Sequence, residues 1–91
     1  NKLGDINEDD IRRAREVDVW TLFDVRNKRG NTCLCIFHDD KHNSFAIKRY
    51  SNGVQGWVCF SCQAKGSGAI DFVMKRDGVL FTDAVKLLFK N

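Results

Sequence analysis

The two stretches Cys35-Ile36-Phe37-His38 and Cys59-Phe60-Ser61-Cys62 decide the fold of this chain, and we call them the first and second zinc knuckles. Each places two metal-binding side chains three residues apart, so that a tight turn can direct both at one ion. A C-x-x-C pair alone has little specificity, but together with C-x-x-H across a hairpin-length gap it is typical of zinc sites. Thiolate sulfur and imidazole nitrogen suit tetrahedral Zn(II). We therefore predict one structural zinc ion, held by Cys35, His38, Cys59 and Cys62 and closed to water and substrate.

Neighbouring residues offer alternatives to this ligand set. Cys33 lies two residues before Cys35, on the same side of an expected strand, but its C-x-C spacing fits the turn less well. His42 is an alternative to His38, and we expect it to be a solvated loop residue. A thioredoxin-like dithiol in the second knuckle would need a βαβ pattern, whereas a glycine-containing hairpin precedes this C-x-x-C.

Length and composition point to one small domain. A chain of 91 residues has little room for a hydrophobic core, and a metal ion is the expected compensation. No apolar run approaches the roughly 18 residues of a membrane span, and no signal-peptide pattern opens the sequence. Four cysteines in that setting favour a metal over disulfides. We expect a soluble, cytoplasmic protein without a membrane partner, and the missing initiator Met suggests a piece of something longer.

Charge is unevenly distributed along the chain. Residues 1–24 hold four Lys/Arg against seven Asp/Glu, a balance of −3, and residues 25–91 hold eleven against five, a balance of +6. The part that carries the zinc knuckles is therefore the basic part. A basic surface favours a polyanionic partner such as nucleic acid, although solvated Lys/Arg faces are common.

Helices are expected on both sides of the knuckles. Asn7 or Asp5 can cap a helix over residues 8–16, and Asp18 can cap a second helix with Val19, Leu22 and Phe23 as its apolar stripe. After a flexible basic linker at residues 63–68, Ser67 can cap a helix that ends at Gly78, and Thr82 can cap a last helix. The predicted apolar stripes are Ile70, Val73 and Met74 on the former helix and Phe81, Val85, Leu88 and Phe89 on the latter.

Between the knuckles lies a β-hairpin signal. Residues 31–37, 45–50 and 54–59 are strand-like, and Asn52-Gly53 separates the last two. We therefore predict an α+β zinc ribbon: a small antiparallel sheet built on a β-hairpin and flanked by helices. It forms a single domain over residues 1–91, with N-terminal helices at 1–24, the zinc-binding hairpin core at 31–62 and C-terminal helices at 67–91.

The turn sets the pairing of the two strands. If Asn52 and Gly53 are the two turn residues, Lys48 opposes Trp57 and Phe45 opposes Phe60, and opposed residues share a face. One face then collects the core residues Phe45, Ile47, Val58 and Phe60, and the other collects Lys48, Tyr50, Gln55 and Trp57. The second set resembles a platform for single-stranded nucleic acid, with rings for bases and cations for phosphates. A slip of one residue would exchange the faces, and Trp57 would then pack under the helices.

Four stretches together resemble the zinc-binding domain of bacterial and phage DnaG-type DNA primases. They are residues 35–45 (CIFHDDKHNSF), 57–62 (WVCFSC), 66–72 (GSGAIDF) and 81–85 (FTDAV), and the similarity covers nearly the whole chain. The resemblance implies a Cys-His-Cys-Cys zinc ribbon whose ligands fall on Cys35, His38, Cys59 and Cys62, without Cys33. It departs at Ile36 and Asn43, where the family usually has proline, and at Ser61, where it often has glycine. These departures suggest a divergent member with altered loop geometry.

The resemblance implies a module that helps recognise single-stranded template DNA for DNA replication, while a separate catalytic domain makes the RNA primer. No acidic cluster for catalytic magnesium is visible in the sequence, so we expect no catalysis from this chain alone. The candidate DNA-contacting residues are Lys41, Lys48, Arg49, Tyr50, Trp57 and Lys65. The alternatives are a zinc-ribbon interaction module that docks on a primase catalytic domain or replicative helicase without reading DNA, and a thiol redox or zinc-sensing role.

Overall fold

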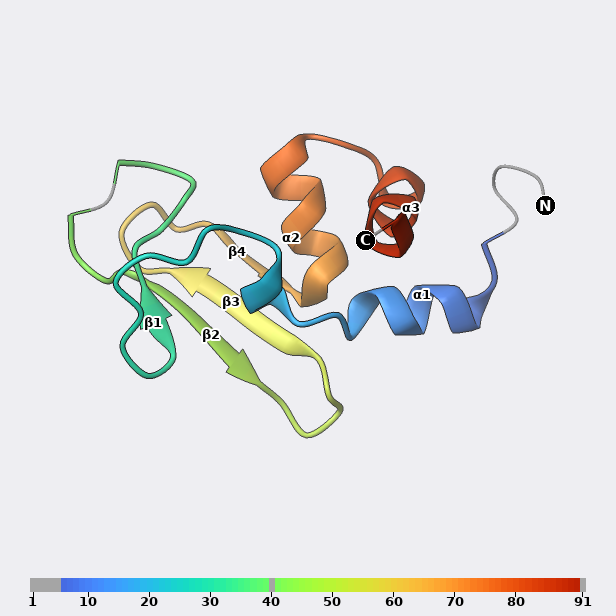
Figure 1. Ribbon diagram of the computed structural model, residues 1–91, viewed down its shortest axis with the longest axis horizontal. Coiled ribbons are helices and arrows are strands. Elements are labelled where there is room, and N and C mark those ends of the chain that lie inside the picture. Colours follow the sequence, from blue (N-terminus) through green and yellow to red (C-terminus); the bar gives the residue numbers. More distant parts are fainter. Residues whose placement is uncertain (1–5, 40, 91) are drawn as a thin grey trace.

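The computed structural model describes residues 6–39 and 41–90, and Figure 1 shows their arrangement. A four-stranded sheet forms one part of the molecule, with α2 along it and α1 and α3 gathered beside α2. This arrangement confirms the predicted α+β class with an antiparallel sheet flanked by helices. In order, the elements are α1 (Glu8–Arg15), the 3₁₀ turn η1 (Val19–Thr21), β1 (Thr32–Cys33), β2 (Phe45–Arg49), β3 (Gln55–Cys59), β4 (Lys65–Ser67), α2 (Gly68–Asp77) and α3 (Phe81–Lys90).

The hairpin between β2 and β3 turns through three residues rather than two. Tyr50 N–H donates to the Val54 carbonyl at 3.0 Å, so Ser51, Asn52 and Gly53 form the loop. Gly53 has a φ of 84°, and the Asn52 side chain accepts from Val54 N–H at 3.0 Å. A three-residue loop with a left-handed glycine is the next most common hairpin connection after the two-residue turns.

This longer loop shifts the strand register by one residue from the prediction. Lys48 pairs with Gly56, Ile47 with Trp57 and Phe45 with Cys59. The prediction was right for β2, whose Phe45 and Ile47 are buried, and wrong for β3. Trp57 is only 3% exposed and Gln55 is buried, whereas Phe60, predicted to be core, is 70% exposed.

The inner face of the sheet carries an aromatic cluster made of Phe23, Phe37, Phe45, Trp57 and Phe72. Phe72 of α2 meets Trp57 edge-on, with ring centroids 5.5 Å apart, and Phe37 of the first knuckle lies 5.7 Å from the same ring. The Trp57 indole N–H donates to the Gly68 carbonyl at 3.1 Å, which satisfies its one polar atom. The cluster thus joins the sheet, the first knuckle and α2 into one core.

The turn η1 is fixed to β3 by a buried amide. The Gln55 side chain accepts from Val19 N–H at 2.6 Å and donates to the Asp18 carboxylate at 3.0 Å. Asp18 also caps Trp20 N–H at 3.2 Å, as predicted, but only one helical turn follows it. The predicted second helix is therefore wrong in extent.

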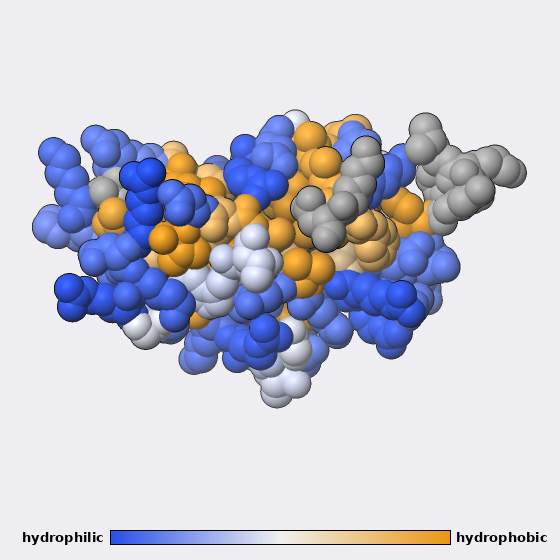
Figure 2. All heavy atoms as spheres, viewed as in Figure 1, coloured by the Kyte–Doolittle hydropathy of each residue, from blue (hydrophilic) through white to orange (hydrophobic). Residues whose placement is uncertain are grey.

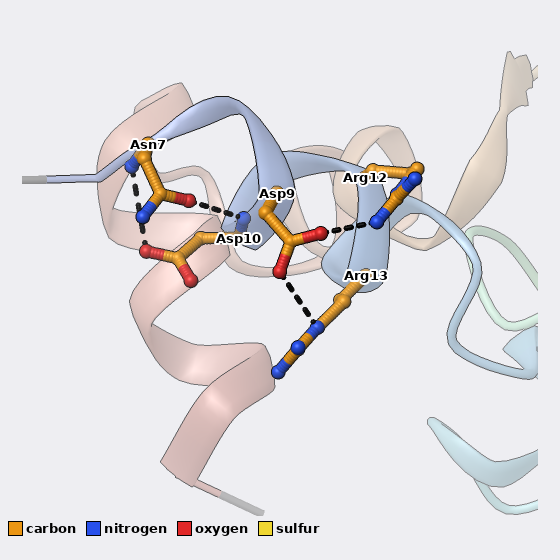
Figure 3. Close-up of polar contacts among 5 residues, drawn as sticks. All are labelled: Asn7, Asp9, Asp10, Arg12 and Arg13. Carbon is orange, nitrogen blue, oxygen red and sulfur yellow. Dashed lines mark hydrogen bonds and ion pairs between the residues drawn. The ribbon is translucent and has the colours of Figure 1, made fainter.

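Polar side chains of helix α1 cap its N-terminus and pair with one another along the helix (Figure 3). Asn7 accepts from Asp10 N–H at 2.8 Å, and the Asp10 carboxylate accepts from Asn7 N–H at 3.4 Å, which makes a capping box. Asp9 forms ion pairs with Arg12 and Arg13 one turn later. The Asn7 cap is confirmed, and the alternative cap Asp5 lies outside the described residues.

Other boundaries differ from the prediction in ways that backbone bonding explains. The strand expected over residues 31–37 is limited to Thr32 and Cys33, because the first knuckle turns away immediately afterwards. Residues 65–67, predicted as linker, pair with β3 as the edge strand β4. Ser67 occupies the cap position of α2 without a side-chain cap bond, and its N–H instead donates to the Asp71 carboxylate at 3.0 Å.

The two C-terminal helices agree better with the prediction. Helix α2 covers residues 68–77 and ends at Gly78 in the left-handed conformation, as expected. Helix α3 starts at Phe81, so Thr82 lies inside it and is not its cap. In the predicted stripes Ile70, Val73, Val85 and Leu88 are buried, whereas Phe81 and Phe89 are exposed. Within the described residues, every helix is too short or too polar to cross a bilayer.

Candidate metal centre and nucleic-acid interface

Both knuckles lie where strands of the sheet end. The first follows β1 and is held by the Leu34 N–H, which donates to the Arg26 carbonyl at 3.1 Å. The second follows β3, and bonds between Cys59 N–H and the Ala64 carbonyl (2.7 Å) and between Gln63 N–H and the Cys59 carbonyl (3.0 Å) close its turn. Gln63 takes a φ of 68° to make that turn. Strands β1 and β3 both pair with β2 and end at the same edge of the sheet, which brings the two knuckles together.

The four predicted ligands meet at one point. One donor atom from each of Cys35, His38, Cys59 and Cys62 lies within 4.8 Å of all the others. The Cys35 and Cys62 sulfurs are 3.9 Å apart, and His38 Nε2 is 3.3 Å from the Cys59 sulfur. A tetrahedral zinc ion with Zn–S bonds of about 2.3 Å needs sulfurs about 3.8 Å apart. The cluster therefore suits one zinc ion, with four protein ligands and a structural role.

Backbone N–H groups of the knuckle turns approach the sulfurs. Phe37 N–H donates to the Cys35 sulfur at 3.3 Å, and Ser61 and Cys62 N–H both donate to the Cys59 sulfur at 3.4 Å. Such donors stabilise thiolates and orient them toward a cation. Burial, in contrast, raises the pKa of the Cys35 thiol to about 12 in the metal-free protein, and neighbouring Cys59 adds to the rise. A bound cation reverses this effect, because a coordinating thiol is deprotonated outright.

The alternative ligands lie elsewhere. Cys33 is fully buried, and its thiol donates to the Leu34 carbonyl at 3.3 Å. His42 is an exposed loop residue, as expected. Neither belongs to the group of four in the part of the chain that the structure describes. Cys33 therefore contributes to the core beside the metal centre.

The outer face of the sheet forms an open groove with a volume of about 760 Å³. Strands β2, β3 and β4 provide its floor, through Ala46, Gly56 and Val58, and Asp71 of α2 lies at its border. Two exposed rings, Tyr50 at 54% and Phe60 at 70%, and two exposed lysines also line it. We call this surface the outer-face groove; its charged and aromatic residues are Lys48, Tyr50, Phe60 and Lys65.

Only some of the predicted DNA-contacting residues line the outer-face groove. Lys48, Tyr50 and Lys65 line the outer-face groove together. Trp57 borders the groove but is buried against the inner cluster, so the expectation that it is an exposed platform is wrong. Lys41 and Arg49 are exposed but do not line the groove, and Arg49 donates to the Gly53 carbonyl at 2.9 Å.

Phe60 is the residue that sequence reasoning missed. It stands between two ligands of the second knuckle, and its N–H donates to the Ser44 carbonyl at 2.8 Å. With the three-residue loop, its position two residues after Val58 places it on the outer face. The signal was present in Ser51-Asn52-Gly53, which fits a three-residue loop as well as a two-residue turn.

Comparison with known proteins agrees with this centre. The CHC2 zinc finger family, the zinc ribbon of DnaG, matches residues 15–91. A DNA primase of Streptomyces coelicolor is 38% identical over an alignment of 92 positions, which covers 93% of this chain and 14% of that protein. A DNA primase of Neisseria meningitidis serogroup A is 46% identical over 78 residues, which cover 80% of this chain and 12% of that protein.

These relatives are much longer than the chain described here, which spans about an eighth of their length. No solved structure gives a significant match. The family match includes both knuckles, all four strands and helices α2 and α3, and the four ligand side chains converge as a zinc site requires. The chain belongs to the CHC2 zinc finger family of DnaG-type DNA primases.

Proposed function

We propose that this zinc-finger domain recognises single-stranded template DNA and so helps a separate catalytic domain to start RNA primers. The observation that supports the proposal is the outer-face groove, where exposed rings and lysines lie on one surface. Single-strand binding sites combine a basic groove with aromatic rings on which bases stack. The names of the relatives, all DNA primases, point to the same process.

Each kind of side chain has a distinct role in the proposal. Tyr50 and Phe60 offer stacking surfaces, each worth about 1–3 kcal/mol per base. Lys48 and Lys65 neutralise phosphates, which adds affinity that weakens with salt. Lys41 and Arg49 remain predicted contacts, and outside the groove they would reach only the flanking backbone of a longer strand.

Zinc acts indirectly in this proposal. Phe60 lies between Cys59 and Cys62, so ligation of both cysteines fixes the backbone that carries the ring. The metal positions one end of the groove without touching DNA. The catalytic step belongs to another part of the primase, and we place the whole assembly in the cytoplasm with a catalytic domain or replicative helicase as protein partner.

Fluorescence anisotropy of a labelled single-stranded oligonucleotide tests the proposal. The zinc-loaded protein is titrated at several salt concentrations, with unlabelled duplex of the same sequence as competitor. We expect binding that weakens as salt rises, and weaker competition by duplex. Affinity falls as salt rises, and the double variant Lys48→Ala/Lys65→Ala should make this dependence less steep. The magnitude of the slope of log affinity against log salt should decrease by about 1.4, since each neutralised phosphate of a single strand contributes about 0.7.

A lysine outside the groove provides the matched control. Lys86→Ala removes one charge from α3 and should leave the salt slope within error of the original protein. A change in slope of about 0.7 for Lys86→Ala, the same per charge as for the two groove lysines, would mean that binding follows net charge rather than the groove. Absence of single-strand binding at low salt would refute the proposal.

Docking on a replication protein is a second candidate function, and a different surface favours it. Figure 2 shows apolar surface over α2 and α3, and four large apolar residues on or next to α3 are exposed: Leu80, Phe81, Leu87 and Phe89. An exposed apolar patch on a small domain is typical of a protein contact. If docking is the function, Leu80→Asp should abolish a salt-insensitive association with the catalytic domain or helicase, and Lys48→Ala/Lys65→Ala should not change it.

A further inference from the structure

The ring of Tyr50 rests on a glycine in the floor of the outer-face groove. A Cβ atom added at Gly56 would lie 2.6 Å from Tyr50 Cε2, 3.3 Å from Cζ and 3.2 Å from the hydroxyl oxygen. Carbon atoms in van der Waals contact lie about 3.5–4.0 Å apart. The ring therefore occupies space that the side chain of any other residue at position 56 would fill.

The backbone at position 56 gives no other reason for glycine. Gly56 lies inside β3, paired with Lys48 of β2 and Ser67 of β4. It is not among the residues with positive φ in the described part of the chain. Glycine inside a strand weakens the strand and often marks a close approach by another group. Here the approaching group is the Tyr50 ring.

Seating the ring does not hide it. Tyr50 remains 54% exposed, and it lines the groove beside Lys48, the residue that faces Gly56 across the ladder. The hydroxyl-bearing end of the ring contacts the floor while the rest stays open to a ligand. An aromatic side chain already held in place loses less conformational freedom on binding.

We propose that Gly56 is a positioning residue: it seats the Tyr50 ring on the outer face, so that the exposed part of the ring stands ready to stack on an unpaired base. This inference rests on the proposed function, because the ligand is the single strand of that proposal. It adds the residue that prepares one of the two stacking rings.

A double-mutant cycle in the zinc-loaded protein tests this role, with single-strand affinity as readout. Tyr50→Ala should weaken binding roughly 5- to 150-fold, the range expected for one base stack. Gly56→Ala should weaken it by a similar or smaller factor, because the new methyl group displaces the ring. In the Tyr50→Ala background, Gly56→Ala should have no further effect. Tyr50→Phe keeps the ring and should stay within about twofold of the original affinity.

Two outcomes of the cycle would overturn the inference alone. If Gly56→Ala costs as much without the tyrosine ring as with it, the methyl group obstructs the groove directly. If Gly56→Ala leaves affinity unchanged while Tyr50→Ala lowers it, the ring needs no seat. Failure of the original protein to bind any single strand would overturn the proposed function, and this inference with it.

A measurement without DNA checks the seat itself. An aromatic ring shifts the NMR resonances of nearby protons, so a Gly56 Hα proton should resonate away from an ordinary strand value in the original protein and return to that value in Tyr50→Ala. An ordinary value in both proteins would show that the ring is not seated there. Zinc content and the thermal unfolding midpoint of each variant separate local displacement of the ring from loss of the fold.

Discussion

At the scale of the residue, Trp57 belongs to the core and stabilises the fold. The ring contacts Phe37 and Phe72, and its N–H is bonded to the Gly68 carbonyl. Truncating a buried large aromatic side chain costs about 3–5 kcal/mol. We therefore expect Trp57→Ala to lower the free energy of unfolding by about that amount in urea titrations of the zinc-loaded protein.

Phe60→Ala is the matched control for that substitution. Phe60 is also aromatic and directly follows β3, but it is 70% exposed. Its truncation should change the free energy of unfolding by no more than about 0.5 kcal/mol. Equal destabilisation by the two substitutions would contradict the assignment of inner and outer faces.

Zinc binding should release protons from the metal centre. Burial holds the pKa of Cys35 at about 12 in the metal-free protein, so this thiol is protonated at neutral pH, whereas a zinc ligand must be a thiolate. Zinc affinity should consequently fall as the pH is lowered. Calorimetric titrations with zinc, repeated at pH 7 in buffers of different ionisation enthalpy, count the protons released, and a value of zero would contradict this account.

The ligands and the missed ring show what single residues reveal before a structure is known. Cys35, His38, Cys59 and Cys62 could be predicted because the spacing within each knuckle is local and has few other uses. The place of Phe60 could not, because the side of a strand that a residue faces depends on a turn several residues away.

At the scale of the element, the β2–β3 loop determines which side chains face solvent. Gly53 has a φ of 84° in open space, where the nearest atom to an added Cβ is 3.8 Å away. A side chain there would meet no clash but would strain the backbone by about 1–2 kcal/mol. We expect Gly53→Ala to lower the free energy of unfolding by that amount, as measured by urea denaturation.

Ser51→Ala in the same loop is the control. Ser51 is exposed and its φ is not positive, so its replacement should leave stability within about 0.5 kcal/mol. A neutral Gly53→Ala would indicate a turn that does not place residue 53 in the left-handed region, and the strand register described above would then be wrong.

Elements were predictable to different degrees for physical reasons. Helix α1 has a complete capping box in its own sequence, and Gly78 marks the end of α2, so local chemistry sufficed for both. Strand β4 could not be predicted from a glycine-rich stretch, because its extended conformation depends on pairing with β3. The turn η1 stops after one turn, and its tie to Gln55 crosses 36 residues of sequence.

At the scale of the whole molecule, the zinc ion joins parts that the core alone holds weakly. The two knuckles come from separate strand ends, and the described aromatic core is small. Zinc binding contributes roughly 10 kcal/mol or more to the folding of zinc-finger peptides. We expect a strong chelator to abolish the β-sheet signal in circular dichroism, and zinc to restore it.

The result that would contradict this expectation is a retained sheet signal in protein shown by elemental analysis to be free of zinc. In that case the aromatic cluster on the inner face would suffice for folding. The overall α+β architecture could be predicted from the paired knuckles and the hairpin signal. Which side chains of β3 face solvent could not, because a shift of one residue in the β2–β3 pairing exchanges the two faces.

The most direct test of the central claim, that the outer-face groove binds single-stranded DNA, is an NMR titration of the zinc-loaded, ¹⁵N-labelled protein with a short single-stranded oligonucleotide. We expect shifts of backbone amide resonances in β2, β3 and β4 and at Phe60, with α3 unaffected. Shifts confined to α3, or none at low salt, would contradict it.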